Sequence, residues 1–478
     1  MYLMRFTKII CTLGPASKTE GDIRKLITCG MNIARVNLSH GSEEQHLETI
    51  RLLKKINEDL RQSANPPMCI GILLDTKGAE VRTADVKVPL VIKAGEEVVF
   101  SHRPLPREKR TIVMVNHENF YADVREAKEI LIDNGLLSFD IVSERSSDGT
   151  VVARARQDGT IGSRRHVNLP GGNLSDPSIT PKDWEDIALA AKEGVDFLAL
   201  SFVRTASDVD EVRKYLEQQG AHIQLISKIE ARQAVRNIRE IVAASDGIMI
   251  ARGDLGVEVP FETVPAIQDD IVALCRQSGK PVIVATQMLE SMITEPIPTR
   301  AEVTDIAHAA TTRADATMLS GETAGGKFPF DAVIAMDHVL LATEEHLLST
   351  PLKDEFPSKN EREARAHAAV TLAQTTNASA LFVMTRSGQT AREIARFRPT
   401  VPIIAFTDSA ETQRSLQLMY GVVPIFSAFS TDPEESVSTA KNEGMRLGVL
   451  HRGDRIVLVS DTLANKQSVN TIQVRRVD

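Results

Sequence analysis

The sequence predicts an α/β fold made of a (β/α)₈ TIM barrel, an inserted β-rich lid domain and a C-terminal α/β domain. Eight short apolar runs, most of them followed by an amphipathic helical segment, predict the barrel, because buried parallel strands are almost continuously apolar. This alternation of apolar strands and amphipathic helices is interrupted between about residues 83 and 166, and the order of predicted strands and helices changes again after about residue 345. We therefore predict a barrel formed by residues 1–82 and 167–345, a lid at 83–166 and a third domain at 346–478.

The predicted barrel strands share an apolar body, and most of them end in polar residues. They cover residues 7–13, 31–41, 68–74, 197–203, 223–230, 247–254, 281–287 and 316–319. Between the fifth and sixth strands, Val235, Ile238, Ile241 and Val242 share one face of a predicted helix. The carboxyl ends of such strands form the rim where α/β folds carry out their chemistry. The polar strand ends are therefore the candidate site.

The insert is predicted to be rich in short strands. Residues 86–92 and 97–100 alternate in polarity, and Asp148-Gly149 and Asp158-Gly159 are typical of hairpin turns. An insert after the third barrel strand projects from the active-site face, which indicates a lid.

The C-terminal part is predicted to be a separate α/β domain. A helix at 361–374 precedes strands near 380–385, 401–407, 422–426, 455–460 and 471–477.

Composition is that of an ordinary globular protein. The 478 residues are 42% hydrophobic and 25% charged, and the formal net charge of −8 argues against a general nucleic-acid binder. The four cysteines (Cys11, Cys29, Cys69 and Cys275) lack metal-binding spacing and are predicted to be reduced. We recognise no secretory signal and no apolar run long enough to span a membrane, so we expect a cytoplasmic protein.

Glu230 and Asp254 lie at the ends of two adjacent predicted strands, and Lys228 lies two residues before Glu230. Two carboxylates at one level of the rim suit a hard cation such as Mg²⁺. The alternative is that both are solvated loop acids.

Other rim residues are candidates for binding anions or cations. Arg35 offers a rigid donor fork for a phosphate or carboxylate, unless it forms a surface ion pair. Asn37, Ser39, Asp75 and Thr76 provide oxygen ligands for a weakly charged cation, although helix caps and turns would explain each one singly. Hydroxyl groups and an acid at the last two strands come from Thr286, Ser320 and Glu322.

Seven segments resemble the signature blocks of pyruvate kinase, in that family's order and over nearly the whole chain. They are MNIARVNLSHG, LLDTKGAEVRT, ISKIE, GIMIARGDLGVE, ATQMLESM, PTRAEVTDIAHA and MLSGETAGG. A long N-terminal extension found in eukaryotic members is missing, so the chain is similar to bacterial members. One departure is Ala79, which stands where the family commonly has proline.

The resemblance implies reversible transfer of a phosphoryl group from phosphoenolpyruvate to ADP, giving pyruvate and ATP. It implies that Mg²⁺ (or Mn²⁺) binds to Glu230 and Asp254, and that K⁺ binds to Asn37, Ser39, Asp75 and Thr76. Arg35 and Lys228 are implied to contact the phosphoryl group, residues near Gly253 and Asp254 to bind the substrate carboxylate, and His40, Arg82 and Arg165 to contact the nucleotide. Protonation of the enolate is implied to proceed through Thr286, Ser320 and Glu322. Glu80 matches members that require K⁺, since independent members carry lysine there. A homotetramer is also implied.

A second phosphate site is predicted in the C-terminal domain. Thr385, Arg386, Ser387, Gly388, Gln389 and Thr390 follow a strand and open a helix predicted at 391–397, an arrangement that binds phosphate, although an ordinary helix cap has the same pattern. The loop matches the family's allosteric sugar-phosphate site. Residues 461–468 lack the Trp, Arg and glycines of members that respond to fructose 1,6-bisphosphate, so we expect a sugar monophosphate or a nucleotide.

Two other functions fit parts of the pattern. A Mg²⁺-dependent 2-oxoacid aldolase also uses a barrel, rim carboxylates and an arginine, but it leaves the lid and the C-terminal loop unexplained. A regulator that binds a phosphorylated metabolite on an inactive barrel is opposed by intact Lys228, Glu230, Asp254 and Thr286.

Overall fold

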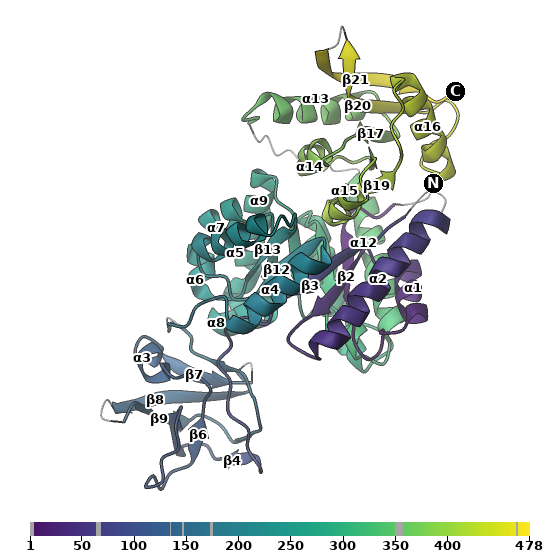
Figure 1. Cartoon of the computed structure of the whole chain (residues 1–478). Helices are drawn as coiled ribbons and strands as arrows, with labels where there is room; N and C mark the ends of the chain where they lie inside the picture. Colours follow the sequence, from purple (N-terminus) through teal and green to yellow (C-terminus); the bar gives the residue numbers. More distant parts are fainter. Residues whose placement is uncertain are drawn as a thin grey trace.

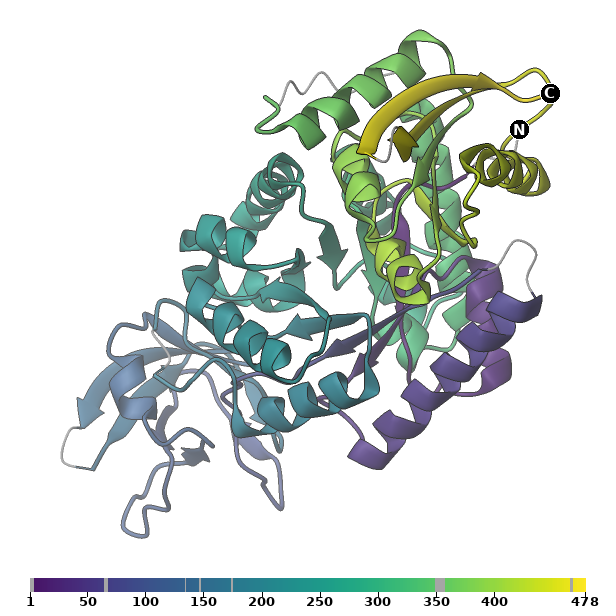
Figure 2. The ribbon, with the colours of Figure 1, turned by 45° about the horizontal axis from the view of Figure 1, so that its top comes forward.

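The computed structural model describes residues 4–63, 68–133, 135–145, 148–172, 175–348, 357–464 and 467–478. The barrel occupies the middle of the molecule, with the β-rich insert at one end and the C-terminal domain at the other (Figure 1). A view turned by 45° keeps the same arrangement (Figure 2).

Eight parallel strands close into a barrel, which confirms the predicted fold class. They are β1 (Lys8–Thr12), β2 (Ile33–Asn37), β3 (Gly71–Asp75), β12 (Phe197–Leu200), β13 (Gln224–Ile229), β14 (Gly247–Ala251), β15 (Val282–Ala285) and β16 (Ala316–Leu319). Their order around the barrel is β1-β16-β15-β14-β13-β12-β3-β2. The inward-facing Ile10, Ile33, Leu73 and Phe197 are fully buried and fill the barrel together with the side chains of the other strands.

Helices surround the barrel and bury their apolar faces against it. They are α1 (Glu20–Cys29), α2 (Glu43–Ser63), α4 (Pro181–Glu193), α5 (Ala206–Gln218), α6 (Arg232–Arg236), α7 (Ile238–Ala244), α8 (Arg252–Glu258), α9 (Val264–Ser278), α10 (Arg300–Thr311), α11 (Gly321–Ala324) and α12 (Pro329–Leu348), with short 3₁₀ turns η1 (Phe261–Thr263) and η2 (Glu290–Ile293). Helix α4 begins with a capping box, in which Thr180 and Asp183 exchange hydrogen bonds. Asp183 Oδ1 also accepts from Gly78 N at 2.9 Å, so the cap holds the loop that leads into the insert.

Several predicted strands were too long at their carboxyl ends. The strand predicted at 197–203 ends at Leu200, and the one predicted at 247–254 ends at Ala251, where α8 begins. Val203 is fully buried although it lies beyond β12, so a buried loop has the same apolar pattern as a strand. The single helix predicted around Val235 and Ile241 is divided into α6 and α7.

The insert contains two sheets, which agrees with the expected β-rich character. Its elements are β4 (Leu90–Ile92), β5 (Glu97–Ser101), β6 (Ile112–Met114), α3 (Phe120–Val124), β7 (Glu129–Ile132), β8 (Leu137–Arg145), β9 (Thr150–Ala155), β10 (Gly159–Ile161) and β11 (Val167–Asn168). One sheet has the order β11-β7-β8-β9-β5-β6, and β10 pairs with β4 in the other.

One of the two predicted hairpin turns is present and the other is wrong. Asp148-Gly149 lies between the antiparallel strands β8 and β9, and Gly149 has a φ of 67°. Asp158-Gly159 does not close a hairpin, because β9 and β10 belong to different sheets. Gly159 serves close packing instead, since a Cβ atom there would lie 2.3 Å from Leu137 Cδ2.

The C-terminal domain is a five-stranded sheet with helices on both faces. Its elements are α13 (Glu361–Thr375), β17 (Ala380–Met384), α14 (Gln389–Arg396), β18 (Ile403–Thr407), α15 (Ala410–Ser415), η3 (Leu416–Leu418), β19 (Val422–Phe426), α16 (Pro433–Arg446), β20 (Arg455–Ala464) and β21 (Gln467–Arg476). The strand order is β19-β18-β17-β20-β21, and only the β20–β21 pair is antiparallel.

Buried ion pairs join this domain to the amino-terminal ends of the barrel strands. Arg398 Nη2 lies 2.6 Å from Asp315 Oδ2, and Arg414 Nε lies 2.8 Å from Asp196 Oδ1. All four cysteines are unpaired, as expected. Within the described ranges, every helix is too short or too polar to cross a membrane.

Candidate active site

A buried carboxylate fixes two cations at the carboxyl rim of the barrel. Asp75, at the end of β3, lies 2.7 Å from Arg35 Nε of β2 and 3.1 Å from Lys228 Nζ of β13. Burial alone would raise the pKa of Asp75, but the charges of Lys228 and Arg35 together lower it. Asp75 is therefore an anion that orients both predicted phosphoryl-binding side chains.

Lys228 is held by three oxygen atoms. Besides Asp75, its Nζ lies 2.9 Å from Glu230 Oε1 and donates to Ser201 Oγ at 2.7 Å. Burial would lower the pKa of Lys228, but the two carboxylates outweigh burial and raise it. The ammonium group therefore stays charged at the rim.

Two hydroxyl groups at this site were missed by the sequence analysis. Ser201 Oγ accepts from Lys228 and donates to Thr76 O at 2.6 Å, and Thr12 Oγ1 accepts from Arg35 Nη1 at 2.8 Å. Ser201 directly follows β12, so a correctly placed strand end would have identified it as a rim residue. Thr12 is the last residue of β1 and carries the same signal.

Glu230 and Asp254 form a carboxylate pair that resists ionisation. Burial raises the pKa of Glu230 to about 7; nearby Asp254 adds to the increase and Lys228 opposes it. The pKa of Asp254 is raised as well, mainly by burial. One oxygen of Glu230 accepts from Phe202 N at 2.7 Å, which aims the carboxylate.

This donor set fits a divalent cation that also binds substrate. Neighbouring carboxylates with raised pKa values are stabilised as anions when a metal binds them. Across the described ranges, no three His, Cys, Asp or Glu side chains gather into a metal-binding group. A cation at Glu230 and Asp254 would therefore take its other ligands from substrate, water or neutral oxygens.

The predicted K⁺ ligands occupy neighbouring positions at the ends of β2 and β3. Asn37 and Asp75 are register partners, and Leu38 N donates to Asp75 O at 2.9 Å. Asn37 Oδ1 accepts from Ser39 N at 3.1 Å, and Thr76 Oγ1 accepts from Ser201 N. The side-chain oxygens of Asn37, Asp75 and Thr76 are thus already engaged in hydrogen bonds within the protein.

The start of α8 contacts the loop after β15. Gly253 N donates to Thr286 Oγ1 at 2.8 Å, so this predicted substrate-binding amide already has a protein partner. Thr286 and Gln287 have φ angles of 67° and 53°, and this left-handed conformation is strained for the β-branched Thr286. Arg252 holds the loop by donating to Thr286 O at 2.8 Å, and its Nη1 lies 2.6 Å from Asp305 Oδ1.

Ser320 and Glu322 follow β16 and have different roles. Glu322 is fully buried and accepts from Ser320 N at 2.7 Å and Leu289 N at 3.0 Å, so it positions two loops. The buried hydroxyl of Ser320 has no hydrogen-bond partner among the described residues. That hydroxyl is available to a ligand or a water molecule.

The predicted nucleotide contacts are divided between the rim and the insert. Arg82 and Arg165 lie on the two connections to the insert, where Thr83 N donates to Arg165 O at 2.8 Å. Arg82 Nε lies 2.6 Å from Glu80 Oε2, and Arg165 is half-exposed with Asp133 at 3.2 Å. His40 is exposed on the loop after β2.

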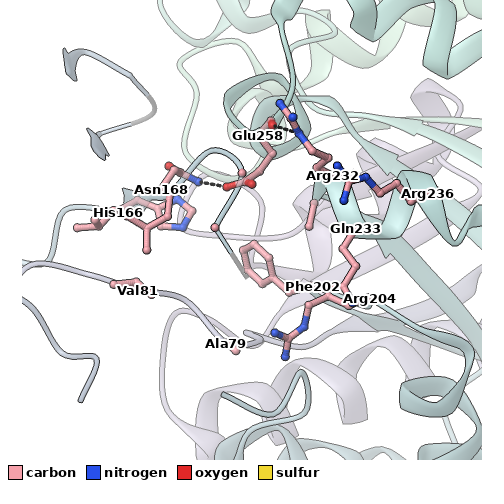
Figure 3. A pocket seen from close by; sticks show the side chains of 15 residues that line it. Ala79, Val81, His166, Asn168, Phe202, Arg204, Arg232, Gln233, Arg236 and Glu258 are labelled. Carbon is pink, nitrogen blue, oxygen red and sulfur yellow. Dashed lines mark hydrogen bonds between the residues drawn. The ribbon is translucent and has the colours of Figure 1, made fainter. Parts of the chain in front are cut away.

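A small cavity of about 60 Å³ lies between the barrel rim and the second connection to the insert (Figure 3). Arg204, Arg232 and Glu258 line its barrel side, and His166 and Asn168 come from the connection. Asn168 Nδ2 donates to Glu258 Oε1 at 3.3 Å. Any movement of the insert against the barrel must change this contact.

The predicted phosphate loop has a compact turn. Gly388, with a φ of 78°, donates to Thr385 Oγ1 at 2.9 Å and precedes α14. Ser387 and Arg386 are exposed, and Arg386 Nε lies 3.5 Å from Asp408 Oδ2. The side chains of residues 461–468, on which the prediction of effector type depends, lie outside the described part of the chain.

Comparisons with known proteins agree with this geometry. Residues 4–333 match the family described as "Pyruvate kinase, barrel domain", and residues 363–475 match "Pyruvate kinase, alpha/beta domain". The chain is 42% identical to "Plastidial pyruvate kinase 2" of Arabidopsis thaliana over 99% of this chain and 81% of that protein. It is 40% identical to "Pyruvate kinase" of Staphylococcus saprophyticus over 96% of this chain and 78% of that protein. Two matching domains and this extent of identity show that the chain belongs to the pyruvate kinase family.

Proposed function

We propose that this enzyme transfers the phosphoryl group of phosphoenolpyruvate to ADP, with Arg35 and Lys228 contacting the group in transit. The observation that supports the proposal best is that Lys228 lies between Asp75 and Glu230, at the carboxyl rim of a barrel that matches the pyruvate kinase barrel domain. Phosphoryl transfer needs alignment and charge neutralisation more than covalent help. Cations fixed in advance in a water-poor site stabilise the charge of the transition state without reorganising.

Glu230 and Asp254 would hold Mg²⁺ or Mn²⁺, which supplies charge neutralisation and a bridge to the substrate. Asn37, Ser39, Asp75 and Thr76 would hold K⁺. Backbone N–H groups around Gly253 and Asp254, at the start of α8, would hold the substrate carboxylate beside Thr286, and Gly253 N would exchange its bond to Thr286 Oγ1 for one to the substrate. His40, Arg82 and Arg165 would contact the nucleotide.

After phosphoryl transfer, the enolate of pyruvate must receive a proton on carbon. The hydroxyls of Ser320 and Thr286 lie after β16 and β15, that of Ser320 is unbonded among the described residues, and buried Glu322 positions Ser320 through its backbone. We assign proton delivery to these hydroxyls or to water that they hold. The insert would exclude bulk water during transfer.

Regulation, assembly and location complete the proposal. The loop from Thr385 to Thr390 would bind the phosphate of an activating metabolite at the start of α14, in a homotetrameric, cytoplasmic enzyme.

A coupled assay of pyruvate formation tests the reaction. Wild-type enzyme should form pyruvate from phosphoenolpyruvate and ADP, and removal of Mg²⁺ should abolish the rate. No product under any metal condition would reject the assignment. An aldolase would release pyruvate from an aldol substrate without ADP, so the same assay separates the two activities.

K⁺ dependence is a further prediction of the proposed cation cluster. Activity should require K⁺, and Glu80→Lys should weaken the requirement by supplying a fixed cation near the rim. The measurement is the initial rate in buffer free of K⁺ and Na⁺, then along a K⁺ titration. Full wild-type activity in the alkali-free buffer would contradict the prediction.

A further inference from the structure

A cavity of about 300 Å³ lies between the barrel and the C-terminal domain, far from the rim site. Its barrel wall comes from α5 and from the segments that enter β12, β13 and β14, and its other wall comes from α14 and α15. Both C-terminal helices lie on the side of their sheet that faces the barrel (Figure 1). The lining residues used below are Arg213, Gln224, Asp246, Arg392, Thr412 and Ser415.

Arg392 brings to this cavity a positive charge that is not neutralised by an ion pair within the described part of the chain. Its Nη2 donates to Ser415 Oγ at 3.0 Å, while its Nε is buried and lacks a hydrogen-bond partner among the described residues. No described carboxylate forms an ion pair with Arg392; burial lowers the pKa of its guanidinium group, and the charge of Asp246, beyond ion-pair distance, partly opposes that shift. Arg392 is partly buried and lines the cavity without an ion-pair partner among the described residues, so an anion that reached it would be stabilised.

The other charges of the cavity wall are largely paired. Arg213 Nη2 lies 3.1 Å from Asp246 Oδ2, and Asp196 pairs with Arg414. The carboxylates of Glu217 and Glu411 are exposed and also line the cavity. They oppose a highly charged ligand and therefore favour one anionic head over several.

The remaining lining is suited to hydroxyl groups. Thr412 and Ser415 carry hydroxyls, and Gln224 carries an amide whose Nε2 reaches Ser415 O at 3.4 Å. Among the described lining residues, the imidazole of His222 is the only ring, so there is no phenyl or indole surface for stacking a nucleobase. These features indicate a small, polar, hydroxylated ligand.

We propose that this interdomain cavity binds a small hydroxylated anion, with its phosphate or carboxylate head on Arg392 and its hydroxyls near Gln224 and Thr412. A guanidinium fork matches either head bidentately. The site is separate from the loop at 385–390, although Ser387 borders the cavity as well.

The position of the cavity links it to the rim. Asp246 directly precedes β14, and Gln224 begins β13. At its opposite end, β14 leads to Asp254, and β13 carries Lys228 and leads to Glu230. The two ends of each strand are about 15 Å apart at the usual rise per residue of a strand. A ligand that prefers one placement of the C-terminal domain against these strand starts would change the affinity of the rim for its substrate.

The structure offers an intrinsic probe of binding. Trp184 is the single tryptophan of the sequence, and its ring lies 5.4 Å from that of Tyr215 on α5, the helix that also carries Arg213. The full-length enzyme would be titrated with inorganic phosphate, glycerol 3-phosphate and glycerate while Trp184 fluorescence is followed. Calorimetric titration of the same samples would give the dissociation constants.

Four variants locate the binding. Arg392→Gln should weaken binding at least about tenfold, because a charge-assisted contact is lost, and Arg392→Lys should recover part of it. Arg452→Gln is the matched control, since Arg452 is exposed elsewhere in the domain. Thr390→Asp blocks the phosphate loop without touching the cavity wall, so it should remove only phosphate bound at that loop and leave the Arg392-dependent binding unchanged.

Glycerol 3-phosphate and glycerate distinguish the head group, because each carries one anionic group of a different kind. Binding of glycerol 3-phosphate alone assigns a phosphate head, and binding of glycerate alone assigns a carboxylate; either result supports the site if Arg392→Gln removes it. The proposal is overturned if none of the three probes binds saturably, if folded Arg392→Gln binds like wild type, or if Thr390→Asp alone abolishes binding. These titrations need no turnover, so their failure is distinct from failure of the phosphoryl-transfer assay.

Discussion

Lys228 shows how the site is organised at the scale of single residues. Its ammonium group lies among Asp75, Glu230 and Ser201, which come from three different parts of the chain. Each partner restricts the side chain before any substrate arrives. The entropy of positioning is therefore lost during folding and not during the reaction.

Lys228→Met should remove nearly all phosphoryl transfer. Methionine keeps much of the side-chain volume but removes the charge, and one such contact is worth on the order of 10²–10³ in rate. The measurement is kcat from the coupled assay, with exposed Lys214→Met as control. A variant that keeps more than about a tenth of the wild-type kcat would exclude this role, since the expected loss is at least about 10².

The raised pKa of Glu230 predicts a specific pH dependence of metal activation. The folded enzyme retains a proton on Glu230 up to about pH 7, above the ordinary value for a glutamate, so metal and proton compete below that pH. The Mg²⁺ concentration for half-maximal rate should fall as pH rises from acid toward 7, by about tenfold per unit for one displaced proton, and then level off.

The same shift has a consequence for stability. Because the folded pKa is raised, Glu230 makes metal-free enzyme less stable as pH rises between its ordinary pKa and about 7. Saturating Mg²⁺ should reduce that loss. Equal Mg²⁺ requirements at pH 6 and pH 8 would contradict the assignment of this group.

At the scale of elements, α8 and the loop after β15 act as one unit. Arg252 joins them through Thr286 O and Asp305, and Gly253 N donates to Thr286 Oγ1. This unit keeps Thr286 in its strained backbone conformation. Arg252 lies outside the proposed substrate contacts and is a positioning residue.

Arg252→Lys should separate positioning from simple stability. Lysine can keep the pair with Asp305 but lacks the fork that also reaches Thr286 O, so we expect kcat to fall about tenfold, the value of one ordinary hydrogen-bond contact near 1.4 kcal/mol. KM for phosphoenolpyruvate and the thermal midpoint should change little. A lower midpoint with unchanged kcat would show that Arg252 serves stability alone.

The elements also show what the sequence predicts well. Continuous apolar runs located all eight barrel strands, because burial on both faces leaves no polar alternation. Strand ends were less well predicted, because Val203 continues the apolar pattern into a buried loop. That error concealed Ser201, which lies within the strand predicted at 197–203 and in fact follows β12.

Contacts between distant segments could not be predicted, because the sequence around each residue carries no pattern that identifies its partner. Arg35 and Lys228 were predicted at the rim, but their common partner Asp75 was assigned only to K⁺. The cation that pairs with Asp315 is supplied by Arg398, 83 residues later. Such pairs depend on how distant segments pack within the barrel and against the C-terminal domain, which local periodicity does not report.

At the scale of the whole molecule, the barrel strands connect two opposite ends. The insert lies beyond their carboxyl ends, and the C-terminal domain contacts their amino-terminal ends (Figure 1). Asp315 directly precedes β16, and Ser320 directly follows it. A change in the position of the C-terminal domain against the barrel therefore acts on β16, the strand that ends next to the proposed proton donor Ser320.

Arg398→Met tests this connection. Asp315 is fully buried, and besides Arg398 it accepts from Val282 N and Tyr420 N at 3.0 Å. Removal of one partner of a buried pair typically costs about 3–5 kcal/mol, so calorimetry should show a lower unfolding temperature. The control is Arg446→Met, which removes an exposed pair with Glu443 and should cost less than about 1 kcal/mol.

The same variant should also weaken regulation. We expect activation by a phosphorylated metabolite, measured as the ratio of half-saturating phosphoenolpyruvate without and with a sugar monophosphate, to fall toward one in Arg398→Met. The reason is that coupling between distant sites requires a connection that both sites can bias, and here the connection is the buried pair beneath β16. If Arg398→Met unfolds at a lower temperature but keeps the full activation ratio, the pair stabilises the interface without transmitting the signal.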